Sequence, residues 1–221
     1  MIYAENILIC IAVPLILLLL FLRGRTRMFV GAFLAGMGVC LLSAYISGFI
    51  SLAGTMGAEN TAVYISPIIE ELMKCLPLFF IHYLFKPGEE RLFMVGAGIG
   101  AGFALFENCC YMLSTGADSL TFILIRSMAV GVMHIVSMVT LAVCVNLAVH
   151  FNALTVQSIA GAVSLAVTFH GLYNLLVSRP GPTSWVGYAL PIVTALFLYV
   201  VFRRIYDRLV EKEVSADPPG S

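Results

Sequence analysis

Two carboxylates and a lysine lie close together in one apolar stretch of this sequence. Glu70 and Glu71 precede Lys74 by four and three residues, so either carboxylate can meet the ammonium on one face of a helix. Charge is costly there, because a charged side chain near the centre of a bilayer costs about 2.5 to 3.5 kcal/mol on insertion scales. One lysine balances one carboxylate, and the other must bind a proton or meet a cation from elsewhere in the chain.

Ionisable and amide side chains also occur in the three apolar stretches that follow. Glu107 has no cation within its own stretch, and His170 and Asn174, four residues apart, share one face of a helix. At about 1.5 Å per helical residue, these groups reach one half of a membrane or its midplane, whereas chance would scatter them over both halves. The predicted site consists of Glu70, Glu71, Glu107, His134, His170 and Asn174, supported by Lys74, Asn108 and Arg126.

Such a set of side chains can activate water. A glutamate beside a histidine can take a proton from water as it attacks a carbonyl, and histidine and asparagine donors can stabilise the oxyanion. No serine or cysteine is recognisably placed as a nucleophile, since Ser66 and Cys75 only flank the paired glutamates. Direct attack by water is therefore favoured over an acyl-enzyme.

Zinc is the alternative form of the same chemistry. Glu107, His134 and His170 could be a Glu/His/His ligand set, with Glu70 or Glu71 as the base. The His-Glu-x-x-His signature of many zinc proteases does not occur in the sequence, which favours the reaction without a metal but leaves zinc possible.

The composition places these residues in a membrane protein. The 221 residues are 61% hydrophobic and 11% charged, and the mean hydropathy is +1.01. We expect an all-α transmembrane bundle, with residues 1–213 as a single domain and residues 214–221 as a disordered tail. The expected spans are residues 4–22, 29–53, 62–85, 92–113, 121–149, 153–177 and 185–205, each near the roughly 20 residues that cross a bilayer.

The basic residues predict the orientation. If the chain crosses the membrane seven times, nine of its twelve Lys and Arg residues fall on one side and one falls on the other, while Lys74 and Arg126 lie within spans. Because basic loops stay in the cytoplasm, we expect the N-terminus outside, the C-terminus in the cytoplasm and the polar site in the outer half of the membrane. The nine are Arg23, Arg25, Arg27, Lys86, Arg91, Arg203, Arg204, Arg208 and Lys212, and the opposite one is Arg179.

The order of the polar motifs resembles the PrsW family of bacterial intramembrane proteases. The resemblance covers roughly residues 60–177, and the family is more distantly similar to the CAAX prenyl protease and Abi families and to the APH-1 subunit of gamma-secretase. It implies a site-1 type protease of the bacterial plasma membrane that cleaves a membrane-anchored anti-sigma factor, with no nucleic-acid partner. The motifs are Glu70-Glu71-x-x-Lys74, Phe103-x-x-x-Glu107-Asn108, His134 and His170-x-x-x-Asn174.

The analogy with CAAX proteases implies individual roles. Glu70 would activate water with help from a histidine, while His170 and Asn174 would face the oxyanion. The sequence departs from the CAAX pattern, because Lys74 replaces an arginine one residue later and Glu107 stands where those enzymes carry a histidine. The division of roles between Glu107 and His134 is therefore open, as is the need for a metal.

Two other functions would also account for a buried polar cluster. A non-catalytic scaffold or substrate-presenting subunit, like APH-1, would use it for helix packing or partner docking. A proton-coupled carrier would use acidic side chains as a relay. The carrier is the least favoured, because the sequence shows no internal repeat and its polar residues stop at the midplane.

Overall fold

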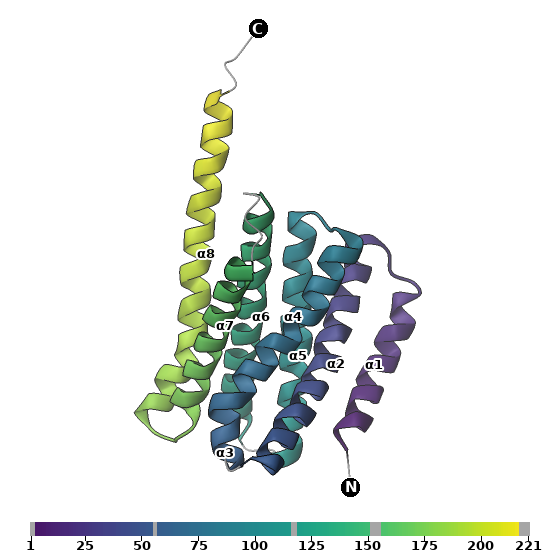
Figure 1. Ribbon diagram of the computed structural model, residues 1–221, viewed down its shortest axis with the longest axis vertical. Helices are drawn as coiled ribbons and strands as arrows, with labels where there is room; N and C mark the ends of the chain where they lie inside the picture. Colours follow the sequence, from purple (N-terminus) through teal and green to yellow (C-terminus); the bar gives the residue numbers. More distant parts are fainter. Residues whose placement is uncertain (1–2, 55–56, 116–118, 151–155, 217–221) are drawn as a thin grey trace.

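The chain folds into a bundle of long helices (Figure 1). The computed structural model describes residues 3–54, 57–115, 119–150 and 156–216, and no strand occurs within these ranges. The long helices are α1 (Ala4–Leu19), α2 (Gly24–Ala53), α4 (Ser66–Phe85), α5 (Glu89–Thr115), α6 (Leu120–His150), α7 (Val156–Val177) and α8 (Pro182–Ala216). The predicted all-α transmembrane fold is confirmed.

Five of the long helices, α2, α5, α6, α7 and α8, are long and apolar enough to cross a membrane by their own composition. Of the other two predicted spans, α1 has only 16 residues, and α4 has 20 residues but carries the three charges. At the C-terminus, α8 runs to Ala216, into the predicted tail, and residues 217–221 lie outside the described ranges.

Helix α5 packs between α2 and α6, and its glycines allow the close approach. A Cβ atom on Gly102 would lie 1.9 Å from the Phe33 carbonyl oxygen of α2, and one on Gly100 would lie 2.5 Å from the His134 carbonyl oxygen of α6. Gly98 and Gly96 repeat the alternation, against α2 and α6 respectively. Small residues at this spacing bring neighbouring backbones together in membranes.

Helix α4 does not begin as a regular α-helix. The short helix α3 (Ala58–Asn60) leads into a π-helix, η1 (Thr61–Ile65), and α4 follows with Pro67 in its first turn. The π-helix ends two residues before Pro67. Such turns are frequent at functional sites, and this one ends five residues before Glu70.

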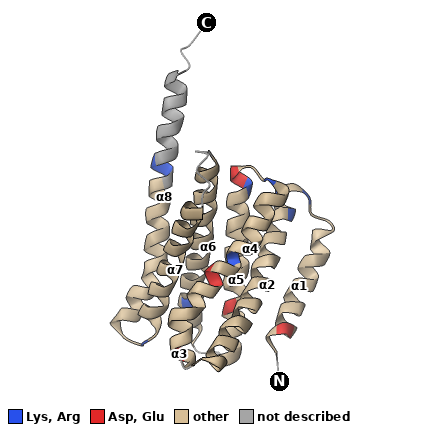
Figure 2. Ribbon diagram, in the orientation of Figure 1, with Lys and Arg blue, Asp and Glu red and all other residues tan. Residues whose placement is uncertain are grey.

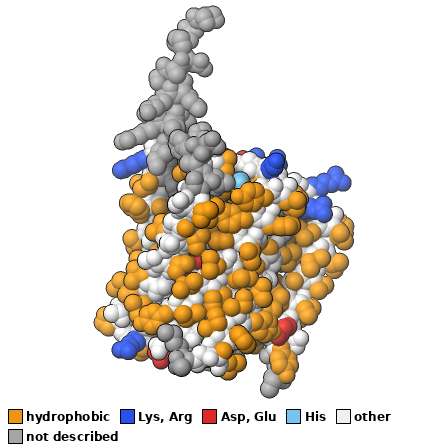
Figure 3. Space-filling model, in the orientation of Figure 1, with side chains coloured by type: hydrophobic (Ala, Val, Ile, Leu, Met, Phe, Trp, Pro, Cys, Tyr) orange, Lys and Arg blue, Asp and Glu red, His pale blue; other side chains and the backbone are white. Residues whose placement is uncertain are grey.

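The exterior divides into an apolar belt and a basic end. Figure 2 shows the Lys and Arg side chains gathered at the end of the bundle with the α1–α2 and α4–α5 connections, and Figure 3 shows an apolar surface below them. Acidic and basic residues also lie within the bundle in Figure 2, at the level of α4, α5 and α6.

Candidate active site

Glu71 is held by three hydrogen bonds from three different helices. Its Oε1 accepts from Lys74 Nζ at 2.6 Å and from His170 Nδ1 at 2.9 Å, and its Oε2 accepts from Ser137 Oγ at 2.6 Å. Glu71 is 2% exposed and Lys74 is fully buried. A buried ion pair is stable only when its remaining hydrogen-bonding capacity is also met, and this arrangement meets it.

His134 connects the lysine to a second carboxylate. Lys74 Nζ lies 2.8 Å from His134 Nδ1, and His134 Nε2 lies 2.5 Å from Glu107 Oε2. Because an ammonium can only donate, Nδ1 of His134 accepts, and Nε2 carries the proton that is donated to Glu107. The tautomer of His134 is thus set by its two partners.

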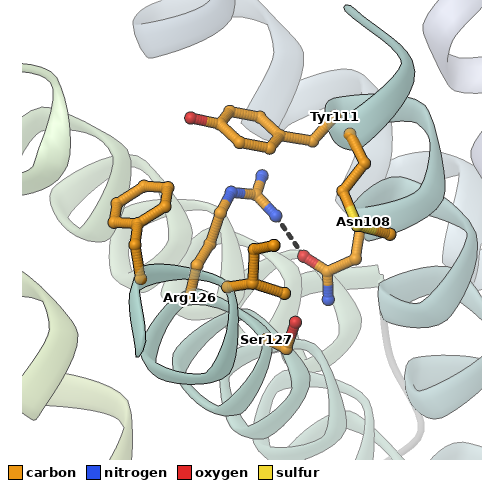
Figure 4. A pocket seen from close by; sticks show the side chains of 7 residues that line it. Asn108, Tyr111, Arg126 and Ser127 are labelled. Atoms are coloured by element: carbon orange, nitrogen blue, oxygen red, sulfur yellow. Dashed lines mark hydrogen bonds between the residues drawn. The ribbon is translucent and has the colours of Figure 1, made fainter. Parts of the chain in front are cut away.

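Arg126 provides the cation for Glu107. Its Nη2 donates to Glu107 Oε1 at 3.3 Å, its Nη1 donates to Asn108 Oδ1, and its guanidinium carbon lies 3.7 Å from the centroid of the Tyr111 ring. Figure 4 shows the guanidinium between the Tyr111 ring and the Asn108 side chain. Arg126, predicted as a supporting residue, therefore extends the polar cluster from His134 toward a small pocket lined by Asn108, Tyr111 and Ser127.

Glu70 is the carboxylate left without a cation. Lys74 is bonded to Glu71 and Arg126 to Glu107, whereas Glu70 Oε2 is buried and has no hydrogen-bond partner among the described residues. It lies 3.7 Å from His170 Nε2. Since His170 Nδ1 donates to Glu71, the Nε2 of a neutral ring presents a lone pair beside Glu70. Two acceptors at this separation can both bind one water molecule.

The same place has the composition of a metal site. One ligand atom each from Glu70, His134 and His170 lies within 4.8 Å of the others, and one carboxylate with two imidazoles is a common zinc set. Glu70 and His170 have a free oxygen and a free nitrogen, but both nitrogens of His134 already have partners. These residue types can bind a metal ion, provided that His134 gives up its hydrogen bond with Lys74 or with Glu107. The sequence had proposed Glu107 as the carboxylate ligand, and the structure groups Glu70 with the histidines instead.

Asn174 lies apart from these hydrogen bonds. Its Nδ2 donates to the Ala62 carbonyl oxygen of η1 at 3.1 Å and so joins α7 to the π-helix. All the other residues of the predicted site form one connected set of side chains on α4, α5, α6 and α7.

Two contributors were missed in the sequence analysis. Ser137 lies one turn beyond His134 on α6, is 3% exposed and bonds Glu71; a polar residue three positions after the histidine was the available signal. Phe103 packs its ring 4.7 Å from that of His134 and 4.9 Å from Lys74 Nζ. The sequence analysis named Phe103 only as the first residue of the Phe103-x-x-x-Glu107-Asn108 motif and assigned it no role in the site.

Comparison with known protein families places most of the chain in one family model. Residues 24–202 match the family model described as PrsW family intramembrane metalloprotease. No curated protein and no solved structure matches the chain.

Proposed function

The chain belongs to the PrsW family of intramembrane metalloproteases, and from this membership we propose that it cleaves a membrane-anchored protein near the outer face of the bacterial plasma membrane. An anti-sigma factor is the proposed type of substrate. Membership of a protease family favours an enzyme over the scaffold and the carrier. The proposed outer position follows from the distribution of basic residues.

We propose Glu70 as the general base, and one observation carries this assignment. Of the three carboxylates, only Glu70 has a buried oxygen without a partner and a histidine nitrogen nearby, at 3.7 Å. A water bound to both Glu70 Oε2 and His170 Nε2 would direct its lone pair away from these acceptors and toward a substrate carbonyl. Glu71, by contrast, is already hydrogen-bonded at both oxygens and would hold Lys74, His170 and α6 in place.

The reaction then needs one proton to move twice. Glu70 takes a proton from water while the water oxygen forms a bond to the peptide carbon. When the carbon–nitrogen bond breaks, Glu70 returns the proton to the departing amine. Asn174 is proposed to donate to the oxyanion through the amide hydrogen that does not bind Ala62.

The experiment that tests the assignment compares four purified proteins on a single-span reporter in detergent. We expect Glu70→Gln to lose about a hundredfold or more in kcat while it keeps the melting temperature of the wild type. Glu71→Gln should lose both activity and stability, because it leaves Lys74 buried without its carboxylate. Glu90→Gln, at an exposed surface ion pair with Arg25, is the control and should change neither. Full activity of Glu70→Gln would exclude Glu70 as the base, and full activity of both Glu70→Gln and Glu71→Gln would exclude the mechanism.

Metal dependence is a separate question with its own measurement. A zinc ion held by Glu70, His134 and His170 would polarise the attacking water and the scissile carbonyl. We propose that the reaction proceeds without a metal. The Lys74 ammonium lies 2.8 Å from His134 Nδ1, so a metal cation bound to His134 would be repelled by the positive charge of Lys74. Cleavage should then persist after chelation. Stoichiometric zinc whose removal abolishes cleavage would overturn this preference and make the three residues ligands.

A further inference from the structure

A groove lies at the end of the bundle opposite to the α1–α2 connection, beside Arg126 and outside the hydrogen-bonded site. It is a hollow of about 510 Å³ between the end of α5, the beginning of α6 and the connection from α7 to α8. Its lining includes four aromatic rings, Tyr111, Phe122, Trp185 and Tyr188, together with Ser119 and Thr121.

The aromatic rings form a continuous series that ends at Arg126. Trp185 contacts Tyr188, Tyr188 contacts Phe122 and Phe122 contacts Tyr111, with ring centroids 6.3 to 6.4 Å apart at each step. Tyr111 then stacks on the Arg126 guanidinium (Figure 4). Isolated Trp and Tyr residues at a membrane surface usually anchor a helix in the headgroup layer. These rings instead contact one another across three helices and line a single hollow.

The groove leads to the candidate active site. It shares Tyr111 and Phe122 with the smaller pocket that contains Arg126 and Asn108. From there the connection is direct, because Arg126 bonds Glu107 and Glu107 bonds His134. Glu107 is 28% exposed, so this side of the site is accessible from outside the bundle.

The polar groups of the groove suit a polypeptide better than a lipid tail. Neither the Tyr111 nor the Tyr188 hydroxyl has a hydrogen-bond partner among the described residues, so both can pair with a peptide backbone, whereas an acyl chain offers no such partner. A protease needs its substrate extended, because the carbonyls of a helix are occupied by the helix's own hydrogen bonds.

We propose that this groove binds an extended segment of the protein substrate, just outside the substrate's own membrane-spanning helix, and directs it past Arg126 toward Glu70 and His170. The rings provide a platform for the side chains of the segment, and the tyrosine hydroxyls bond its backbone. The inference rests on the proposed function and adds to it the place where the substrate enters.

The first test blocks the groove. Thr121 is exposed and lines it, so Thr121→Trp should raise KM for the single-span reporter about tenfold while kcat and the melting temperature stay close to wild type. Leu196→Trp adds the same side chain at an exposed position of α8 that is not part of the groove lining, and it should change nothing. An unchanged KM in Thr121→Trp would contradict the proposal.

The second test does not depend on catalysis. A benzophenone side chain is placed at position 121 or, as the control, at position 196, in the Glu70→Gln variant reconstituted with the reporter in phosphatidylcholine vesicles. Cross-linking of the reporter from position 121 and not from 196 supports the proposal. Cross-linking to lipid alone, or equally from both positions, overturns it. If the wild type cleaves no membrane-anchored reporter, the proposed function fails, whereas the cross-linking result decides separately whether the groove binds the reporter.

Discussion

At the scale of single residues, the difference between Glu70 and Glu71 is the most informative feature of the site. The two carboxylates are adjacent in sequence, yet Glu71 is bonded by Lys74, Ser137 and His170, while Glu70 retains a buried oxygen without a partner. A carboxylate that is fully hydrogen-bonded is held in place and is a poor proton acceptor. Glu70, which is less constrained, is therefore the better candidate for the base that takes a proton from water.

A prediction about Ser137 follows from its bond to Glu71. Ser137→Ala removes the donor 2.6 Å from Glu71 Oε2 and leaves that buried oxygen unpaired, at a cost of about 1 to 3 kcal/mol. We expect a lower melting temperature and a lower kcat with little change in KM, because Ser137 orients the site and does not touch the substrate. Steady-state kinetics and thermal unfolding in detergent measure both effects.

Ser47 provides the matched control for that substitution. It is also buried in the bundle, but its hydroxyl has no hydrogen-bond partner among the described residues. Ser47→Ala should therefore leave stability unchanged or slightly raised, and activity unchanged. Equal losses in the two variants would mean that the effect of Ser137→Ala is one of packing alone.

At the scale of helices, α5 fixes the distances within the site. Its glycines allow α2 on one side and α6 on the other to approach within backbone contact. Gly100 contacts the backbone of α6 at His134 itself. The position of this histidine thus depends on an α5 residue with no side chain.

The alternation of the glycines gives a prediction in which stability and activity separate. Gly102→Ala and Gly100→Ala both force overlap with a neighbouring backbone, and each should cost about 1 to 3 kcal/mol of stability. Gly100→Ala should also lower kcat on the order of a hundredfold, because it moves His134. Gly102→Ala displaces α2 instead and should leave kcat unchanged. Gly131→Ala on α6, where a Cβ would meet nothing within 4 Å, is the control. Equal effects of Gly100→Ala and Gly102→Ala on kcat would contradict this account.

At the scale of the whole molecule, the basic end of the bundle sets the side of the membrane on which cleavage is expected. The α1–α2 and α4–α5 connections carry basic residues at the end opposite to α3 and to the α7–α8 connection (Figure 2), which lines the groove. If the basic end is cytoplasmic, the groove opens outside the cell.

Labelling of introduced cysteines tests this orientation in intact cells. A membrane-impermeant maleimide should label Thr183→Cys, which is exposed at the beginning of α8 on the groove side. It should label Gly88→Cys, exposed between α4 and α5, only after the cells are broken. The reverse pattern would place the site in the cytoplasmic half and exclude cleavage at the outer face.

The sequence by itself determined the class of the fold and proposed most members of the candidate site. Seven apolar segments could bury their backbone polar groups only as membrane helices, and nine polar side chains placed at similar depth identified where chemistry could occur. The helix boundaries were close, except that the π-helix before α4 and the length of α8 beyond the bundle have no clear signal in composition.

Only the tertiary structure decided which polar groups are partners. Spacing along α4 allowed Lys74 to pair with either glutamate, and no spacing relates it to His134, Ser137 or His170 on other helices. The choice depends on how each helix is rotated and how closely α5 lets α6 approach, and contacts between helices set both. For this reason the sequence could predict a surplus carboxylate, while the packed bundle identifies it as Glu70.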